Sequence, residues 1–230
     1  MNDEIIFLDT TLRDGEQTPG VNYFPEEKLK IARELVKLNI PIIEAGFPIA
    51  SESDFEGVNK VAREIGGKLN SPIICGLARA NKKDIEVAAK ALDPAYKPRI
   101  QILVPASDIQ IKNTMNSSHQ EILNLTGEIV NYALKYVDDI EFTALDACRS
   151  NRDFLYKLLS LAIAEGARTL EIPDTVGYVT PLDYGDLISG IMNKVQDIEK
   201  AVVATHCHDD LGLATANTLA GLMAGARQAE

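Results

Sequence analysis

Two of the three histidines in the chain lie one residue apart, in the segment THCHDDLG (205–212). If this segment ends a β-strand, His206 and His208 point to the same face, because side chains alternate along a strand. Two imidazoles aimed at one point provide the geometry that a protein-bound metal ion needs. The alternative is a polar strand end whose histidines are solvated, and the rest of the sequence has to decide between the two.

A second dense group of polar residues lies in LDTTLRDGEQTPG (8–20). Arg13 and Asp14 are adjacent at the end of an apolar run, and Gly15 relaxes the backbone after them. A carboxylate such as Asp14 can complete a His/His/carboxylate metal set, and a nearby arginine can stabilise an oxyanion that develops in a reaction. The alternative is a charged turn in which Arg13 and Asp14 only neutralise their neighbours.

Short apolar runs and longer amphipathic stretches alternate along the chain and would position these residues. Seven runs rich in Ile and Val predict strands, at residues 5–11, 40–47, 71–78, 99–107, 139–147, 168–176 and 201–208. Between them, apolar residues recur at three- and four-residue spacing, which predicts helices. The candidate helix N-caps are Asn81, Ser117 or Ser118, Asn151 and Thr180. Alternating strands and helices indicate an α/β fold with a parallel sheet.

Seven predicted strands and seven predicted helices suit a doubly wound sheet, and they also suit a (β/α)8 barrel that lacks one strand, because the chain stops at Glu230 where an eighth strand should begin. No linker interrupts the pattern, so we expect residues 1–230 to form a single, partial barrel domain. A barrel without its eighth strand has open edges that invite pairing. We therefore expect a homo-oligomer, a partner chain that covers the open edge, or a longer native polypeptide.

Composition excludes several classes of partner. The chain of 230 residues is 46% hydrophobic and carries a net charge of −11 without any basic run, so neither nucleic acid nor an anionic membrane surface is an expected partner. No apolar stretch approaches the ~20 residues that span a bilayer, so we expect no membrane insertion. The first residues lack the pattern of a targeting segment, which favours a cytoplasmic protein, or a plastid one if a transit peptide has been removed.

The strand ends indicate where a site would lie. In parallel α/β folds, ligands bind at the carboxyl ends of the strands. All seven predicted strands end in polar residues, among them Glu44 after the second and Thr175 after the sixth. A purely structural barrel needs no such ring of polar side chains, so we expect a binding site at this end.

Taken in order, these motifs resemble the 2-isopropylmalate synthase group of the DRE-TIM metallolyase superfamily. The resemblance covers essentially the whole chain, with matches at DTTLRDGEQTPG (9–20), EAGFPIAS (44–51), CGLARANKKDIE (75–86), DACRS (146–150), IPDTVGY (172–178) and HCHDDLGLATANTLAGLMAGARQ (206–228). It implies a TIM (β/α)8-type barrel, truncated after the seventh βα unit. It also implies an acyltransferase of leucine biosynthesis that condenses acetyl-CoA with a 2-oxo acid, 2-ketoisovalerate by default. Citramalate and homocitrate synthases, which belong to the same superfamily, are alternatives.

The same resemblance implies roles for individual residues. Asp14, His206 and His208 would bind a divalent metal, Zn²⁺, Mn²⁺ or Mg²⁺, which would polarise the oxo group. Arg13 would be catalytic, stabilising enolate or oxyanion charge.

Other positions would lie on the substrate side of this site. Thr175 would contact the substrate carboxylate, and Gln17 and Glu44 would lie near the metal or its waters.

The sequence departs from the family pattern at the substrate side. Gln101 lies on the fourth predicted strand where family members generally carry a histidine, and glutamine is no general acid or base near pH 7. On the fifth predicted strand, Thr143 and Leu145 occupy the positions of a usual Ser and Glu. The family's last metal ligand, an asparagine after the eighth strand, would fall beyond Glu230.

Two interpretations follow from these departures, and whether the chain is an active enzyme stays open between them. In the first, the chain is the catalytic domain of a synthase with shifted specificity, in which Leu145 favours an apolar substrate tail. In the second, it is a catalytically impaired, synthase-like paralogue that acts as a structural or binding subunit of a larger complex.

Overall fold

Eight strands alternate with helices in the computed structural model, which describes residues 4–230. The strands are β1 (Ile6–Asp9), β2 (Ile42–Gly46), β3 (Ile73–Arg79), β4 (Pro98–Pro105), β5 (Asp139–Leu145), β6 (Thr169–Asp174), β7 (Val202–Cys207) and β8 (Gln228–Ala229). They follow one another in chain order as a closed barrel, and the registered pairs are parallel. The predicted TIM-barrel fold class is confirmed.

The expectation that the eighth strand is absent was wrong. Gln228 and Ala229 form the short strand β8, whose register pairs them with Ala204 and Thr205 of β7. A two-residue strand is too short to produce a periodic pattern, so the sequence did not reveal it. Because β8 is hydrogen-bonded to β7, that edge is not open, and the argument for a partner chain loses its physical basis there.

Helices follow the strands, and all but α4 lie where the amphipathic stretches predicted them. They are α1 (Pro25–Lys37), α2 (Glu52–Glu64), α3 (Lys82–Leu92), α4 (Asp108–Met115), α5 (His119–Ala133), α6 (Arg152–Ala164), α7 (Pro181–Lys194) and α8 (Ala214–Met223). Short 3₁₀ turns form at η1 (Gly15–Gln17), η2 (Ala147–Arg149) and η3 (Ile198–Lys200). Within residues 4–230, no helix has the length and apolar character needed to cross a membrane.

The described chain divides into two compact units. Among the described residues, unit 1 comprises residues 4–6, 103–131 and 141–230, and unit 2 comprises residues 7–102 and 132–140. The boundaries fall inside β1, β4, α5 and β5, so the chain passes between the units within regular secondary structure.

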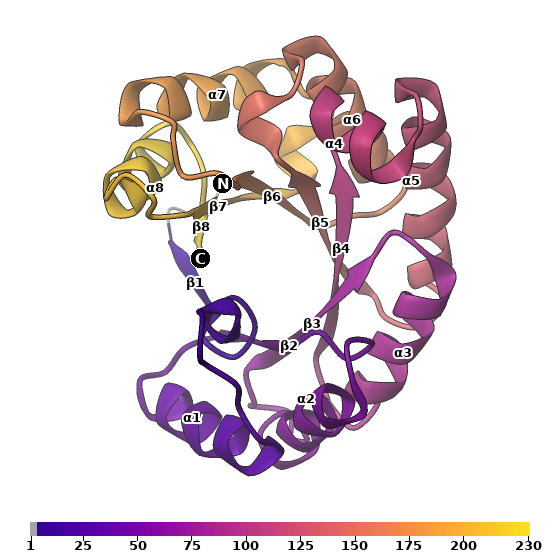
Figure 1. Cartoon of the computed structure of the whole chain (residues 1–230), viewed down its shortest axis with the longest axis vertical. Helices are drawn as coiled ribbons and strands as arrows, with labels where there is room; N and C mark the ends of the chain where they lie inside the picture. Colours follow the sequence, from indigo (N-terminus) through magenta and orange to yellow (C-terminus); the bar gives the residue numbers. More distant parts are fainter. Residues whose placement is uncertain (1–3) are drawn as a thin grey trace. The chain divides into compact units, whose positions relative to one another are not determined.

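Unit 2 is built on β2 and β3. Helix α1 packs against α2, α2 packs against α3, and the three helices cover these strands, as Figure 1 shows in indigo and purple. Leu29, Val58 and Ile85 supply one buried apolar residue from each of the three helices. Burial of these apolar faces is the main source of stability in such a layer.

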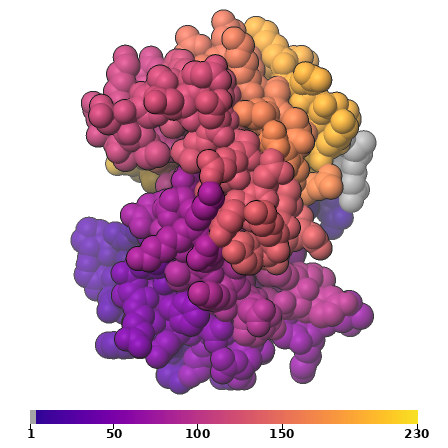
Figure 2. Space-filling view, turned by 90° about the vertical axis from the view of Figure 1, so that its right-hand side faces the viewer, coloured from indigo at the N-terminus to yellow at the C-terminus, as the bar shows by residue number. Residues whose placement is uncertain are grey.

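Unit 1 contains the register β5–β6–β7–β8 and the two closely packed helices α7 and α8. These helices lie side by side in Figure 1, and in Figure 2 the yellow atoms of α8 lie beside the orange atoms of α7. Gly221 makes the close approach possible, because a Cβ at this position would lie 2.6 Å from the Thr205 methyl and 2.8 Å from the Tyr184 ring. Tyr184 is fully buried, and its hydroxyl donates to the Ile172 carbonyl at 2.6 Å.

Candidate metal centre

The two histidines of the HCH segment lie close together at the end of β7, within unit 1. Their ring centroids are 5.2 Å apart and the ring planes meet at 66°. His206 is 6% exposed, whereas His208 is half-buried. The pair therefore offers one imidazole inside the protein and one at its margin.

The tautomer of His208 is fixed by a backbone acceptor. Its Nδ1 lies 2.7 Å from the carbonyl oxygen of Thr175. Because a carbonyl oxygen only accepts hydrogen bonds, a proton belongs on Nδ1. Histidine binds a metal as a neutral imidazole, so Nε2 would be the ligating nitrogen of this ring.

His206 faces two carboxylates with the corresponding atom. Its Nδ1 lies 3.4 Å from Glu171 Oε1 and 3.5 Å from Glu230 Oε2. Both distances exceed the usual N–H···O range of 2.7–3.2 Å. The carboxylates therefore lie near Nδ1 at ion-pair distance rather than hydrogen-bond distance, on the same ring nitrogen that faces an oxygen at His208.

These carboxylates belong to a buried cluster that the sequence analysis did not identify. Gln228 Nε2 donates to Glu141 Oε1 at 3.0 Å and to Glu230 Oε1 at 2.6 Å. Burial, then the charges of Glu141 and Glu171, raise the pKa of Glu230 well above its ordinary value. The available signal was the presence of acidic residues inside strands, since Glu141 and Glu171 interrupt otherwise apolar runs.

The predicted residues of the first strand end lie in unit 2, where Arg13 connects two acids. Its Nη1 donates to Asp14 Oδ1 at 2.8 Å, and its Nε donates to Glu44 Oε1 at 2.6 Å. The Glu44 side chain is fully buried, whereas that of Asp14 is 24% exposed. The guanidinium is therefore held in place, and the Asp14 carboxylate remains accessible.

Lys28 supports this segment from α1, and the sequence analysis did not single it out. The fully buried ammonium donates to the Leu12 carbonyl at 3.0 Å, to Glu16 Oε2 at 2.7 Å and to the Ala45 carbonyl at 3.4 Å. Space exists because Gly46 lacks a Cβ, which would lie 2.8 Å from this nitrogen. The sequence signal was a lysine on the apolar face of α1, seven residues before buried Leu35.

Thr175 lies just after β6, beside the loop that follows β5. Its Oγ1 accepts a hydrogen bond from the Asp146 backbone N–H at 3.0 Å. A hydroxyl carries one proton besides its acceptor sites, so this contact leaves the Thr175 proton to donate. Asp146 is engaged elsewhere, because Arg149 donates to both of its oxygens at 2.7 Å.

The remaining predicted substrate-side residues lie in different environments. Gln101 is fully buried in β4, and Thr143 is 1% exposed in β5. The Thr143 hydroxyl donates to Glu171 Oε2. Leu145 is half-buried at the end of β5, and Gln17 is exposed at the end of η1.

The donor types in unit 1 fit a divalent ion. Neutral imidazoles and carboxylate oxygens suit Zn²⁺ and Mn²⁺, and carboxylates also suit Mg²⁺. One ligand atom from each of Glu171, His206 and Glu230 lies within 4.8 Å of the others. This set shares His206 with the HCH pair.

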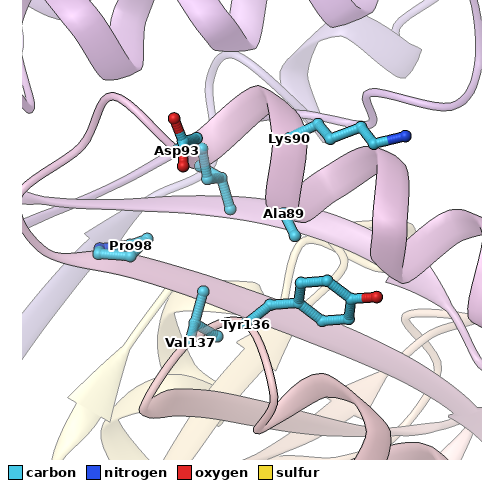
Figure 3. A pocket seen from close by; sticks show the side chains of 7 residues that line it. Ala89, Lys90, Asp93, Pro98, Tyr136 and Val137 are labelled. Carbon is cyan, nitrogen blue, oxygen red and sulfur yellow. The ribbon is translucent and has the colours of Figure 1, made fainter.

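A separate pocket in unit 2 contains none of the predicted site residues. Figure 3 shows it between the end of α3, the start of β4 and the segment after α5. Its lining residues are Ala89, Lys90, Leu92, Asp93, Pro98, Tyr136 and Val137. It opens at the amino ends of the strands, where α/β folds do not usually bind substrates.

Comparison with known proteins matches the chain to one family. The family model described as HMGL-like matches residues 4–230. A 2-isopropylmalate synthase of Crocosphaera subtropica is 53% identical over 99% of this chain and 42% of its own length. One of Synechocystis sp. is 52% identical over 99% of this chain and 43% of its own length. The chain thus spans less than half the length of these curated relatives.

Solved structures share the fold at low sequence identity. Hydroxymethylglutaryl-CoA lyase from Pseudomonas aeruginosa matches with a TM-score of 0.79 and 19% identity, over 100% of this chain and 76% of that one. The carboxyl transferase domain of Rhizobium etli pyruvate carboxylase matches with a TM-score of 0.74 and 14% identity, over 99% of this chain and 40% of that one. These two likenesses support the barrel fold and nothing finer.

Proposed function

The chain belongs to the HMGL-like family, and from this premise we propose that it forms the metal-dependent catalytic domain of a 2-isopropylmalate synthase. The reaction would be a Claisen condensation of acetyl-CoA with a 2-oxo acid. The 52–53% identity to synthases of that name supports this reaction class. Because the chain spans 42–43% of those relatives, the activity of the whole protein is part of the proposal.

In this proposal, His206, His208 and Asp14 hold the divalent metal. When bound, the metal polarises the oxo carbonyl of the substrate. The observation that carries the proposal is the orientation of the two imidazoles. At both histidines Nδ1 faces an oxygen atom, so Nε2 would be the nitrogen that ligates the metal.

Arg13 and Thr175 would then act directly on the substrates. The Arg13 guanidinium, held by Glu44 and Asp14, stabilises negative charge that develops on oxygen during the condensation. The Thr175 hydroxyl, whose oxygen already accepts from a backbone N–H, donates a hydrogen bond to the 2-oxo acid carboxylate. The orientation of each side chain is thus fixed by hydrogen-bond partners within its own unit.

Leu145 narrows the class of oxo acid. An aliphatic side chain at the end of β5 accommodates an apolar tail and rejects a second carboxylate, because a charge placed against it would lose hydration without a partner. A branched aliphatic oxo acid is therefore the proposed substrate, and a dicarboxylic one is disfavoured. Gln101 would hydrogen-bond but not transfer a proton.

The experiment that tests this function compares metal binding with turnover. The purified chain is titrated with Mn²⁺, and CoA release from acetyl-CoA is followed across a panel of aliphatic and dicarboxylic 2-oxo acids. His208→Ala is expected to lose both metal binding and CoA release. His119→Ala is the matched control, because His119 is the third histidine, stacks on Phe154 and pairs with Asp108 on the surface.

Two results would separate the competing interpretations. CoA release that depends on an aliphatic oxo acid and disappears in His208→Ala supports an active synthase. Metal binding that disappears in the same variant, without CoA release from any oxo acid, supports an impaired, binding-type paralogue. Unchanged metal affinity in His208→Ala would refute the proposed ligand set itself.

A further inference from the structure

The buried carboxylates beside His206 are connected to it through the register of three strands. Thr143 of β5 is the register partner of Glu171 on β6, and Glu171 is the partner of Ala204 on β7. His206 lies two residues after Ala204, so its side chain points to the same face of β7. Parallel pairing therefore places Thr143, Glu171 and His206 in sequence across the sheet.

The contacts follow this order. The Thr143 hydroxyl donates to Glu171 Oε2, and the other oxygen of this carboxylate lies 3.4 Å from His206 Nδ1. From β8 and the residue after it, Gln228 Nε2 donates to Glu230 Oε1, and Glu230 Oε2 lies 3.5 Å from the same histidine nitrogen. Each carboxylate thus has one oxygen held by a donor and one oxygen at the imidazole.

All these side chains are inaccessible to solvent. Thr143 is 1% exposed, Glu171 is 2% exposed, and the Glu230 side chain is fully buried. Water therefore does not compete for His206 Nδ1, and the protein alone determines how the ring is oriented and which nitrogen carries the proton.

We propose that Glu171 is a positioning residue that orients the His206 imidazole for metal binding, with Thr143 fixing Glu171 and the Glu230 carboxyl lying within 3.5 Å of the same ring nitrogen. A carboxylate that accepts from the Nδ1 proton holds the ring, keeps Nε2 unprotonated and increases its basicity. His206 would be the stronger metal ligand of the two histidines, because the acceptor at His208 Nδ1 is a neutral carbonyl instead of a carboxylate. This inference rests on the proposed metal site and adds to it the residues that prepare one ligand.

A different use of the same side chains is a second ion held directly by Glu171, His206 and Glu230, whose ligand atoms lie within 4.8 Å of one another. That arrangement would require His206 Nδ1 to lose its proton and to ligate. It predicts two ions per chain, whereas the positioning role predicts one.

The test uses Glu171→Gln, which keeps the shape and removes the charge. Affinity for Mn²⁺ is expected to fall about 10–100-fold, the usual effect of losing such a partner. Thr143→Val should weaken binding in the same direction, and Thr143→Ser, which keeps the hydroxyl, should restore it. Glu165→Gln is the control, because Glu165 follows α6 and accepts instead from Asn131.

A readout without metal separates this inference from the proposed function. Long-range ¹H–¹⁵N spectra of the metal-free protein report which nitrogen of His206 is protonated. Wild type is expected to carry the proton on Nδ1, and Glu171→Gln to show a mixture of tautomers. If wild type binds no metal but the tautomer shifts as expected, the proposed function fails, while the orientation of the His206 ring by Glu171 stands.

Two outcomes would overturn the inference. One is a Glu171→Gln, Glu230→Gln double variant that folds, keeps the His206 tautomer and binds Mn²⁺ with wild-type affinity. The other is a stoichiometry of two ions per wild-type chain, one of which is lost in Glu171→Gln, because that result assigns the carboxylates as direct ligands.

Discussion

Replacing Lys28 by Met tests whether a buried ammonium holds the segment that carries Arg13 and Asp14. The substitution keeps most of the aliphatic stem and removes Nζ. Three hydrogen bonds are lost, to Leu12 O, to Glu16 Oε2 and to Ala45 O. One carbonyl belongs to the 12–16 segment and the other to the end of β2, so both lose their shared donor.

The loss of stability depends on how far water can replace the lost ammonium at its partners. A hydrogen bond that involves a charged group contributes ~1.5–3 kcal/mol to stability. Removing only the donor costs more than this, because the buried acceptors are left without a partner. The Glu16 and Asp54 side chains are 17% and 24% exposed, so their carboxylates regain part of their hydration. We therefore expect a loss of about 3 kcal/mol, which for a chain of this size lowers Tm by about 6–12 °C.

The assay is thermal unfolding at neutral pH, followed by Mn²⁺ titration of the folded variant. Lys37→Met is the matched control, because Lys37 lies on the same helix, is 69% exposed and pairs with exposed Glu34. It should leave Tm unchanged. If Lys28→Met melts within 1 °C of wild type, the hydrogen bonds of Nζ do not stabilise this segment, and the reasoning is refuted.

Three further predictions concern other parts of the chain. Gly221→Ala should destabilise by about 1–3 kcal/mol because its Cβ has no room, whereas Gly185→Ala on α7, whose Cβ would meet its nearest atom at 3.6 Å, should raise Tm slightly; thermal melts check both. Burial opposes ionisation of Asp84, but hydrogen bonds led by Arg79 outweigh it and hold its pKa below its usual value. Its contribution to stability is therefore present above the unfolded-state pKa and is lost as pH falls through the lower folded-state pKa, so the Tm difference between wild type and Asp84→Asn should shrink from pH 7 to pH 3. Leu145→Glu should reduce CoA release with aliphatic oxo acids more than with dicarboxylic ones, and equal losses would contradict its role in specificity.

The alternation of strands and helices was predictable because each element repeats its own apolar period. Where that period was weak, the prediction missed the element. Helix α4 buries only Ile111 among its residues, so its pattern did not stand out, although Ser107 caps it. The predicted caps Asn81, Asn151 and Thr180 each accept a backbone N–H, because capping depends on a residue type at a local position.

The first strand shows how a local polar contact changes a boundary. The apolar run predicted a strand over 5–11, but β1 ends at Asp9. The Asp9 carboxylate accepts from the Thr11 N–H at 3.0 Å, and the carbonyl of Thr10 accepts from three following N–H groups. Side-chain acceptors of this kind compete with the sheet for backbone donors, which a hydrophobic pattern does not register.

The sequence predicted which types of residue form the site, but not which of their atoms would face a metal ion. The spacing of His206 and His208 indicated two imidazoles on one face, but it gave no information on which nitrogen each would present. That choice is made by Thr175 O for one ring and by Glu171 and Glu230 for the other, all distant in sequence from His206 and His208 or on another strand. In a neutral histidine, the acceptor that takes the proton of one ring nitrogen determines that the other nitrogen can bind the metal. The acceptor therefore matters to metal binding as well as the ligand. Removing an acceptor should therefore weaken the site while leaving every predicted ligand in place, which a search of the sequence for ligands alone would not anticipate.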